Sequence, residues 1–174
     1  LSFCLILGFS AVQGQSFQEI YETLYNEEND SLLYLHLQKW EAAEPEKEEM
    51  FIAWFNYYYR KSQQSVIGLG GDPREGDNIG IQDSAGNTVG FMYNEVMFND
   101  SLFNLCQDYL RRGLELHPDR LDMYFGKIYS LRELGRYEDH IADILKVIAR
   151  GKENGHAWLW AKGEPLEDSE EFFK

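Results

Sequence analysis

The feature that most constrains this chain is a helical pattern of large apolar residues that recurs along it. The first copy is Phe17-x2-Ile20-Tyr21-x2-Leu24, and the second, 34 positions later, is Phe51-x2-Trp54-Phe55-x2-Tyr58. Residues separated by three, four and seven positions lie on one face of a helix. A third copy is Tyr124-x2-Lys127-Ile128-x2-Leu131, and Trp158 lies 34 positions beyond its start. The recurrence predicts amphipathic helices arranged as repeats.

A second helical pattern follows each of these segments. The second patterns are Leu33-x3-Leu37, Cys106-x3-Leu110 and His140-x3-Ile144. Pro45 and Pro118 follow the first two. Proline cannot continue a helix, so it marks the boundary between one pair of helices and the next. The sequence therefore predicts antiparallel helix pairs.

The stretch Leu134-Gly135-Arg136-Tyr137-Glu138-Asp139 matches the turn between the two helices of a tetratricopeptide repeat, with Gly135 suited to the left-handed cap. The chain resembles that family, in a secreted bacterial form, over about residues 14–154. The resemblance implies an all-α fold of antiparallel helix-pair repeats, a TPR-like solenoid, with a small β-hairpin insertion. Lys127 and His140 depart from the family pattern, which prefers an apolar residue and alanine there.

The insertion is expected at about residues 64–99, where the helical pattern is absent. Apolar residues alternate with polar or small ones on both sides of a turn-forming segment at 83–87. This predicts a hairpin from about Asn78 to Tyr93. The glycine-rich segment Gly68-Leu69-Gly70-Gly71 is interpreted as a flexible turn.

The two ends of the chain are expected to lie outside a complete repeat array. Residues 1–14 have the apolar run and small residues of a signal peptide that begins before Leu1 and is cleaved after about Gly14. A secreted or periplasmic location follows, with a repeat domain over 15–174. Trp158-Leu159-Trp160 is interpreted as the start of another first helix, so further repeats are expected after Lys174.

The balance of charge restricts the partners. The formal net charge is −14, with 30 acidic and 16 basic side chains. Such a surface repels nucleic acid and anionic lipid, and the sequence predicts no integral membrane segment. A protein or peptide ligand, basic if the charge is used for binding, fits better. The charge is also consistent with solubility alone. The sequence does not determine the oligomeric state.

The sequence predicts no catalytic residue, no metal site and no cofactor. The four histidines and two cysteines have no metal-ligand spacing. Asp72, Asp77 and Asp83 supply oxygen ligands, but their spacing does not match a calcium loop. Cys106 is expected to pack as a small apolar residue. The chain is therefore not expected to be an enzyme, unless catalytic residues follow in a longer protein.

The family resemblance implies a concave groove lined by the first helix of each pair. The implied groove positions are Gln18, Glu22, Tyr25, Ile52, Asn56, Tyr59, Arg60, Asp122, Phe125, Tyr129, Arg132 and Glu133. Of these, the candidate ligand-binding residues are Glu22, Tyr25, Asn56, Tyr59, Arg60, Tyr129, Arg132 and Glu133. Asparagine and arginine there could hold a peptide backbone or carboxylate.

Two functions remain open at this point. The first is a binding or scaffold protein that mediates protein–protein interaction through the groove, the inserted hairpin or both. The alternative is a glycan-binding accessory protein of a bacterial nutrient-uptake system, in which aromatic side chains would stack on sugars. The aromatic candidates are Trp40, Trp54, Tyr57, Tyr58 and Tyr59.

Overall fold

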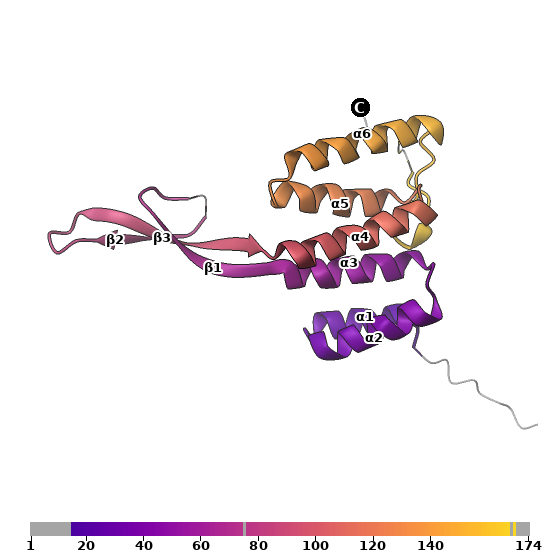
Figure 1. Ribbon diagram of the computed structural model, residues 1–174, viewed down its shortest axis with the longest axis horizontal. Coiled ribbons are helices and arrows are strands. Elements are labelled where there is room, and N and C mark those ends of the chain that lie inside the picture. The colour runs from indigo at the N-terminus through magenta and orange to yellow at the C-terminus, as the bar shows by residue number, and fades with distance from the viewer. Residues whose placement is uncertain (1–14, 75, 168, 170–174) are drawn as a thin grey trace, which may run out of the picture.

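Six helices form three consecutive pairs in the computed structural model, which describes residues 15–74, 76–167 and 169 (Figure 1). The helices are α1 (Phe17–Asn26), α2 (Asp30–Ala43), α3 (Glu48–Ser62), α4 (Asp100–Leu116), α5 (Leu121–Glu133) and α6 (Tyr137–Glu153). Each odd-numbered helix packs on the helix that follows it, and α2 with α3 and α4 with α5 join the pairs into one stack. The expected signal peptide, residues 1–14, lies outside the described residues.

Local capping determines where the helices begin and end. Ser16 and Glu19 form a capping box at the start of α1, because each side chain binds the other residue's backbone N–H. Asn29 and Asn99 cap α2 and α4 with a single hydrogen bond each, which the side-chain oxygen accepts from a backbone N–H of the first turn. Gly135, with φ of 76°, ends the α5 segment in the left-handed conformation that its place in the sequence predicts.

The main core lies between α1, α2, α3 and α4, with contributions from α5. Leu37, Phe51, Trp54 and Phe103 are at most 1% exposed there, and they come from three different helices. Burial of side chains this large contributes about 1.5–3 kcal/mol each before entropy is counted. A second, smaller cluster around Trp158 joins α5 to α6. The recurring apolar pattern of the sequence therefore does form the core.

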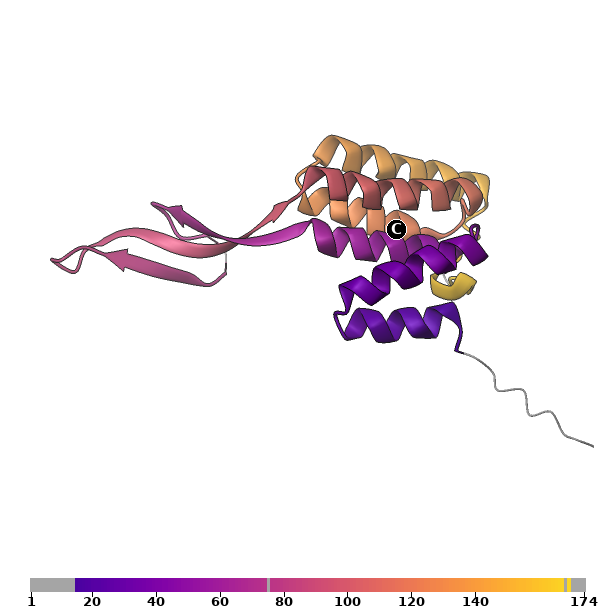
Figure 2. The same cartoon turned by 60° about the horizontal axis from the view of Figure 1, so that its bottom comes forward.

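A three-stranded antiparallel sheet lies between α3 and α4 in the sequence, although the two helices pack on each other. Its strands are β1 (Gln63–Gly70), β2 (Asn78–Gln82) and β3 (Thr88–Phe98), in the order β1-β3-β2. We call residues 63–98 the arm, because the sheet projects away from the stacked helices (Figures 1 and 2). The backbone N–H of Asn99 donates to the carbonyl of Ser62 over 2.7 Å, so the arm leaves and re-enters the helices at one point.

The expected all-α class is therefore wrong: the described residues form six α-helices and a three-stranded sheet. The antiparallel pairing of β2 with β3 is confirmed, but the first strand, β1, was not predicted. The segment interpreted as a flexible turn, Gly68 to Gly71, is instead largely part of this strand. A Cβ at Gly68 would lie only 2.3 Å from Cε2 of Tyr93 on β3. Gly68 and Gly70 leave space for this ring, but they also remove the alternation of apolar and polar side chains by which a strand is recognised in a sequence.

The segment after α6 also differs from expectation. Trp158 does not begin a helix; it is 2% exposed and packs in the second core cluster. Leu159 forms isolated β-bridges with Arg120 and with Pro165, and a short 3₁₀ helix, η1 (Ala161–Gly163), lies between Leu159 and Pro165. Gly155 and Gly163 have positive φ, which turns the chain back toward the start of α5.

Candidate functional site

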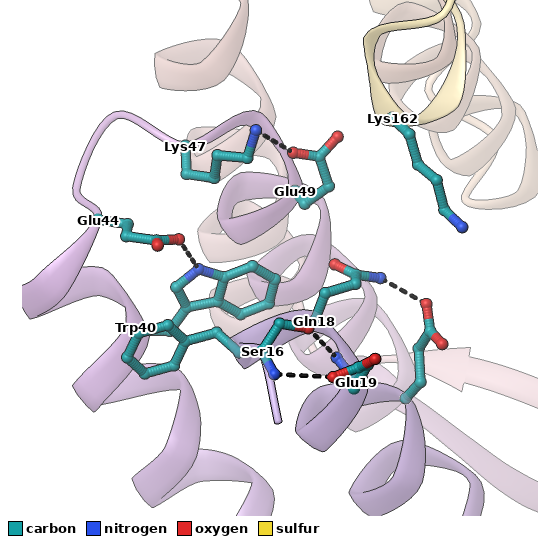
Figure 3. A pocket seen from close by; sticks show the side chains of 10 residues that line it. Ser16, Gln18, Glu19, Trp40, Glu44, Lys47, Glu49 and Lys162 are labelled. Carbon is teal, nitrogen blue, oxygen red and sulfur yellow. Dashed lines mark hydrogen bonds and ion pairs between the residues drawn. The ribbon is translucent and has the colours of Figure 1, made fainter. Parts of the chain in front are cut away.

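Two adjoining cavities lie where the starts of α1, α3 and α5 meet η1. They have volumes of about 590 and 160 Å³ and share the lining residues Gln18, Glu49 and Lys162. We call the pair the groove, and Figure 3 shows the side chains that line the larger cavity. Its remaining lining residues are Ser16, Phe17, Glu19, Tyr21, Glu22, Trp40, Glu44, Lys47, Ile52, Ala53, Asn56, Arg120, Asp122 and Ala161.

One side of the groove combines aromatic rings with carboxylates. The rings of Phe17 and Trp40 are stacked, with centroids 6.0 Å apart and planes 6° from parallel. Glu44 accepts a 2.8 Å hydrogen bond from the indole N–H of Trp40. Glu22 accepts one from the amide of Gln18, also over 2.8 Å. Each carboxylate keeps further lone pairs, so either one could still bind a cationic group.

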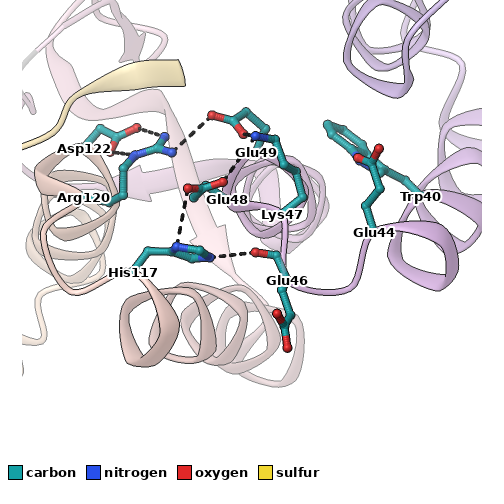
Figure 4. A network of polar contacts seen from close by, with 9 residues as sticks. All are labelled: Trp40, Glu44, Glu46, Lys47, Glu48, Glu49, His117, Arg120 and Asp122. Atoms are coloured by element: carbon teal, nitrogen blue, oxygen red, sulfur yellow. Dashed lines mark hydrogen bonds and ion pairs between the residues drawn. The ribbon is translucent and has the colours of Figure 1, made fainter. Parts of the chain in front are cut away.

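The other side of the groove is held by a buried arginine (Figure 4). Arg120 is 1% exposed and donates to both oxygens of Asp122 over 2.9 and 2.8 Å, and to Glu49 over 3.1 Å. Burial alone would lower its pKa, but these hydrogen bonds and charges outweigh it and raise the pKa. The network fixes the start of α5 against the start of α3. Lys47 adds a second cation beside Glu49, at 3.3 Å.

Lys162 is the basic residue of the groove that remains available to a ligand. Its side chain extends from η1 into the region that Glu49 and Gln18 border (Figure 3). Lys162 has φ of 62°, and it forms no ion pair with any residue in the described part of the chain. The ammonium group is exposed, so it can bind an acidic or carbonyl oxygen without first breaking a salt bridge.

Two of the predicted binding residues, Glu22 and Asn56, line the groove. Asn56 donates a 3.3 Å hydrogen bond to the hydroxyl of Tyr21. Burial raises the pKa of Tyr21 to about 12, so its hydroxyl stays protonated and can donate in turn. The implied positions Gln18, Ile52 and Asp122 also lie here. The structure therefore brings together the part of the predicted groove nearest the starts of α3 and α5.

Tyr25 and Arg60 lie elsewhere and already bind each other. The guanidinium carbon of Arg60 is 4.2 Å from the centroid of the Tyr25 ring, and Arg60 donates to the Tyr25 carbonyl over 3.1 Å. Asp30 accepts from Arg60 over 2.5 Å and from Lys61 over 3.0 Å. This cluster ties α3 to the turn between α1 and α2, a structural use of both residues.

Tyr59, Tyr129, Arg132 and Glu133 lie toward the ends of α3 and α5, away from the groove. Tyr59 is half-buried and stacks on Phe55, with centroids 5.6 Å apart. Burial raises the pKa of Tyr59. Arg132 lies over the exposed ring of Tyr129 at 5.3 Å and pairs with Glu133 at 3.1 Å. The eight predicted residues thus occupy three separate places.

The aromatic candidates for sugar stacking are mostly internal. Trp40 and Trp54 are each 1% exposed, and Tyr57 is 9% exposed. Trp54 stacks on Tyr58 and on Tyr109 within the core. A sugar ring needs an accessible aromatic face, and neither tryptophan offers one. Cys106 is also buried, which raises the pKa of its thiol to about 12.

Sequence reasoning missed Glu44, Lys47, Glu49, Arg120 and Lys162 as groove residues. Glu44, Lys47 and Glu49 lie around the α2–α3 connection, and Arg120 comes directly before α5. Lys162 was expected inside another helix pair. Nothing in the local pattern marks these residues, because four of the five lie in connections or in the η1 turn rather than on a helix face. Only their meeting in space distinguishes them.

No protein-family model matches the chain, and no curated protein or solved structure is detectably similar to it. The resemblance to tetratricopeptide repeats therefore depends on the residue pattern alone. Within the described residues, no cluster of three or more His, Cys, Asp or Glu is placed to hold a metal ion. No helix in the same part of the chain is long and apolar enough to cross a membrane.

Proposed function

We propose that this chain is a binding or scaffold protein whose groove holds an extended, basic segment of a partner protein. The observation that carries the proposal is the cavity of about 590 Å³ lined by Glu19, Glu22, Glu44 and Glu49. A cavity of this size is typical of ligand sites. Its carboxylates and the partly exposed ring of Phe17, which rests on buried Trp40, suit a lysine or arginine side chain, whose stem is apolar and whose end is cationic.

The backbone of such a ligand also finds partners. The Oε1 atom of Gln18 is buried and accepts no hydrogen bond from any described residue. Gln18 lines both cavities, so a ligand N–H could satisfy this atom. Lys162 could bind a ligand carbonyl or carboxylate at the opposite side. The overall charge of −14 favours the approach of a basic segment.

The test is a titration with two unstructured, fluorescently labelled peptides of equal length, one rich in Gly, Ser and Lys and the other with Glu in place of Lys. The Lys peptide should bind, and the Glu peptide should not. Glu22→Lys should weaken binding of the Lys peptide by about tenfold or more, because it replaces an attraction inside the cavity by a repulsion.

The matched control is Glu27→Lys. Glu27 is exposed at the end of the same helix, outside the groove, and the variant has the same net charge as Glu22→Lys. An equal loss of affinity in the two variants would show that only the overall charge attracts the peptide. That result would contradict the proposed groove.

A further inference from the structure

The arm has one face that is apolar and uncovered. In β1, Ile67 and Leu69 are 68% and 67% exposed, and in β2 Ile79 is 66% exposed. Met92 of β3 lies directly between Leu69 and Ile79 in the strand register, so these three side chains form one row across the whole sheet. Val96, on the same side of β3, is 55% exposed. We call these five residues the apolar face.

The centre of the opposite face is covered from within the arm. Tyr93 lies over Gly68 and Gly70 of β1, and it is only 8% exposed. The guanidinium carbon of Arg74 lies 5.1 Å from the centroid of the Tyr93 ring. The sheet therefore has a small core of its own on one side. The apolar face is covered by a side chain of the described helices only at the base of the arm, where Phe98 of β3 packs on Phe103 of α4.

We propose that the apolar face docks an amphipathic helix of a partner protein that has lysine or arginine along its flanks. The width of the sheet favours one helix. Three strands about 4.8 Å apart span roughly 10 Å between the outer strands, which matches the diameter of one helix with its side chains. A shallow cavity of about 150 Å³ between Ile67, Ile79 and Met92 is large enough to receive one apolar side chain of that helix.

The charge of the arm favours a basic partner. Between Gln63 and Phe98 the sequence has five acidic residues and one basic residue. Asp77 borders the cavity on the apolar face, where it can pair with an ammonium or guanidinium group of the docked helix. A second copy of this chain is a poorer occupant, since it would bring a charge of −14 toward an equal charge.

The test uses a synthetic amphipathic peptide of Leu and Lys, about 18 residues long, so that it can form a stable helix when bound. A second peptide has Glu in place of Lys and the same apolar face. Labelled peptide is titrated with the full chain. The Leu/Lys peptide should bind and gain helical circular dichroism, and the Leu/Glu peptide should bind at least about tenfold more weakly.

The decisive variant is Ile67→Ser/Ile79→Ser, which removes two exposed apolar residues from the apolar face. It should weaken Leu/Lys peptide binding by about tenfold or more. The control is Met97→Ser, because Met97 is 56% exposed but lies on the opposite side of β3 from Val96. It should change the affinity by less than about twofold. Equal losses in the two variants would overturn the proposal.

A second variant guards against loss of the arm itself. Asp77→Lys keeps every apolar residue of the apolar face and reverses the charge beside its cavity. It should weaken the Leu/Lys peptide, whereas Glu22→Lys in the groove should not. If Glu22→Lys removes binding and both arm variants leave it intact, the helix binds the groove and the proposal is wrong. A peptide-independent dimer in sedimentation that the double variant abolishes would also overturn it, in favour of a second copy.

Discussion

A charged residue occupies a core position of the helical pattern at Lys127 of α5. Lys127 pairs with Asp143 of α6, which is 3% exposed and also accepts from Lys146 over 2.7 Å. His140, the other departure from the pattern, contacts the carbonyl of Ile128 over 2.9 Å through its Nδ1. Both departures therefore join α5 to α6 by polar contacts where the family resemblance implied apolar ones.

Removing one partner of this ion pair should be costly. Asp143→Ala leaves the largely buried ammonium of Lys127 without its counter-charge, and we expect a loss of about 3–5 kcal/mol in the free energy of unfolding. Lys146→Ala is the control, because Lys146 is 65% exposed and should cost about 1 kcal/mol or less. Urea titration of the three proteins measures both values. Equal, small losses would show that the pair does not stabilise the fold.

The same pair predicts a dependence on pH. Burial would raise the pKa of Asp143, but the hydrogen bonds from Lys127 and Lys146 outweigh it and lower the pKa below its usual value. Because the pKa of Asp143 is lower in the folded state than in the unfolded state, its ionised carboxylate stabilises the fold above about pH 4. This stabilisation is lost as the pH falls through the folded-state pKa. The stability difference between wild type and Asp143→Asn should therefore shrink below about pH 4 in urea titrations.

The glycine at position 68 has a specific packing role. A Cβ there would lie 2.3 Å from the Tyr93 ring, so Gly68→Ala should displace the ring from β1. We expect the aromatic NMR signals of Tyr93 to shift toward those of an exposed tyrosine, and the free energy of unfolding to fall by about 1–3 kcal/mol. At Gly71 an added Cβ would meet nothing within 4 Å, so Gly71→Ala is the control. Unchanged Tyr93 signals in Gly68→Ala would contradict this packing.

At the scale of elements, the arm is attached to the helices through its two ends. Gln64 pairs with Met97, and Phe98 beyond that pair packs on Tyr59 and Phe103. The main core is otherwise formed by helical residues. The helices α3 and α4 bury each other's apolar faces, so their stability should not depend on the outer part of the sheet.

Replacing residues 65–96 by a short Asn-Gly turn should therefore leave the helices folded. We expect the helical circular dichroism to remain and the free energy of unfolding to change by about 1 kcal/mol or less. The same replacement combined with Phe98→Ala should be destabilising by about 3 kcal/mol, since Phe98 contacts the core. Loss of cooperative unfolding in the first variant would show that the arm is part of the core.

At the scale of the whole molecule, the net charge should control how quickly basic ligands bind. The chain has a formal charge of −14, and this field attracts cations from a distance. Raising the salt from about 20 to about 200 mM shortens the Debye length from roughly 20 to roughly 7 Å. The association rate of the Gly/Ser/Lys peptide should fall by about tenfold or more, and the dissociation rate should change less. Stopped-flow fluorescence measures both rates, and an unchanged association rate would contradict steering.

The sequence by itself determined the positions of the six helices and the pairing of β2 with β3. These features depend on short-range signals. Apolar residues every three or four positions, the prolines Pro45 and Pro118, and alternation on either side of a turn all act within about ten residues. The net charge and the burial of Cys106 could also be predicted from the sequence.

Only the tertiary structure decided β1, the fold-back after α6 and the groove. Gly68 is part of a strand because it pairs with Tyr93, 25 positions later, whose ring occupies the space that a side chain at position 68 would need. Arg120 lines a cavity because it binds Glu49, which lies 71 positions away in the sequence. Lys162 reaches the same cavity because Trp158 is buried between α5 and α6. These placements depend on contacts between distant residues, and a local pattern of residue types carries no record of such contacts.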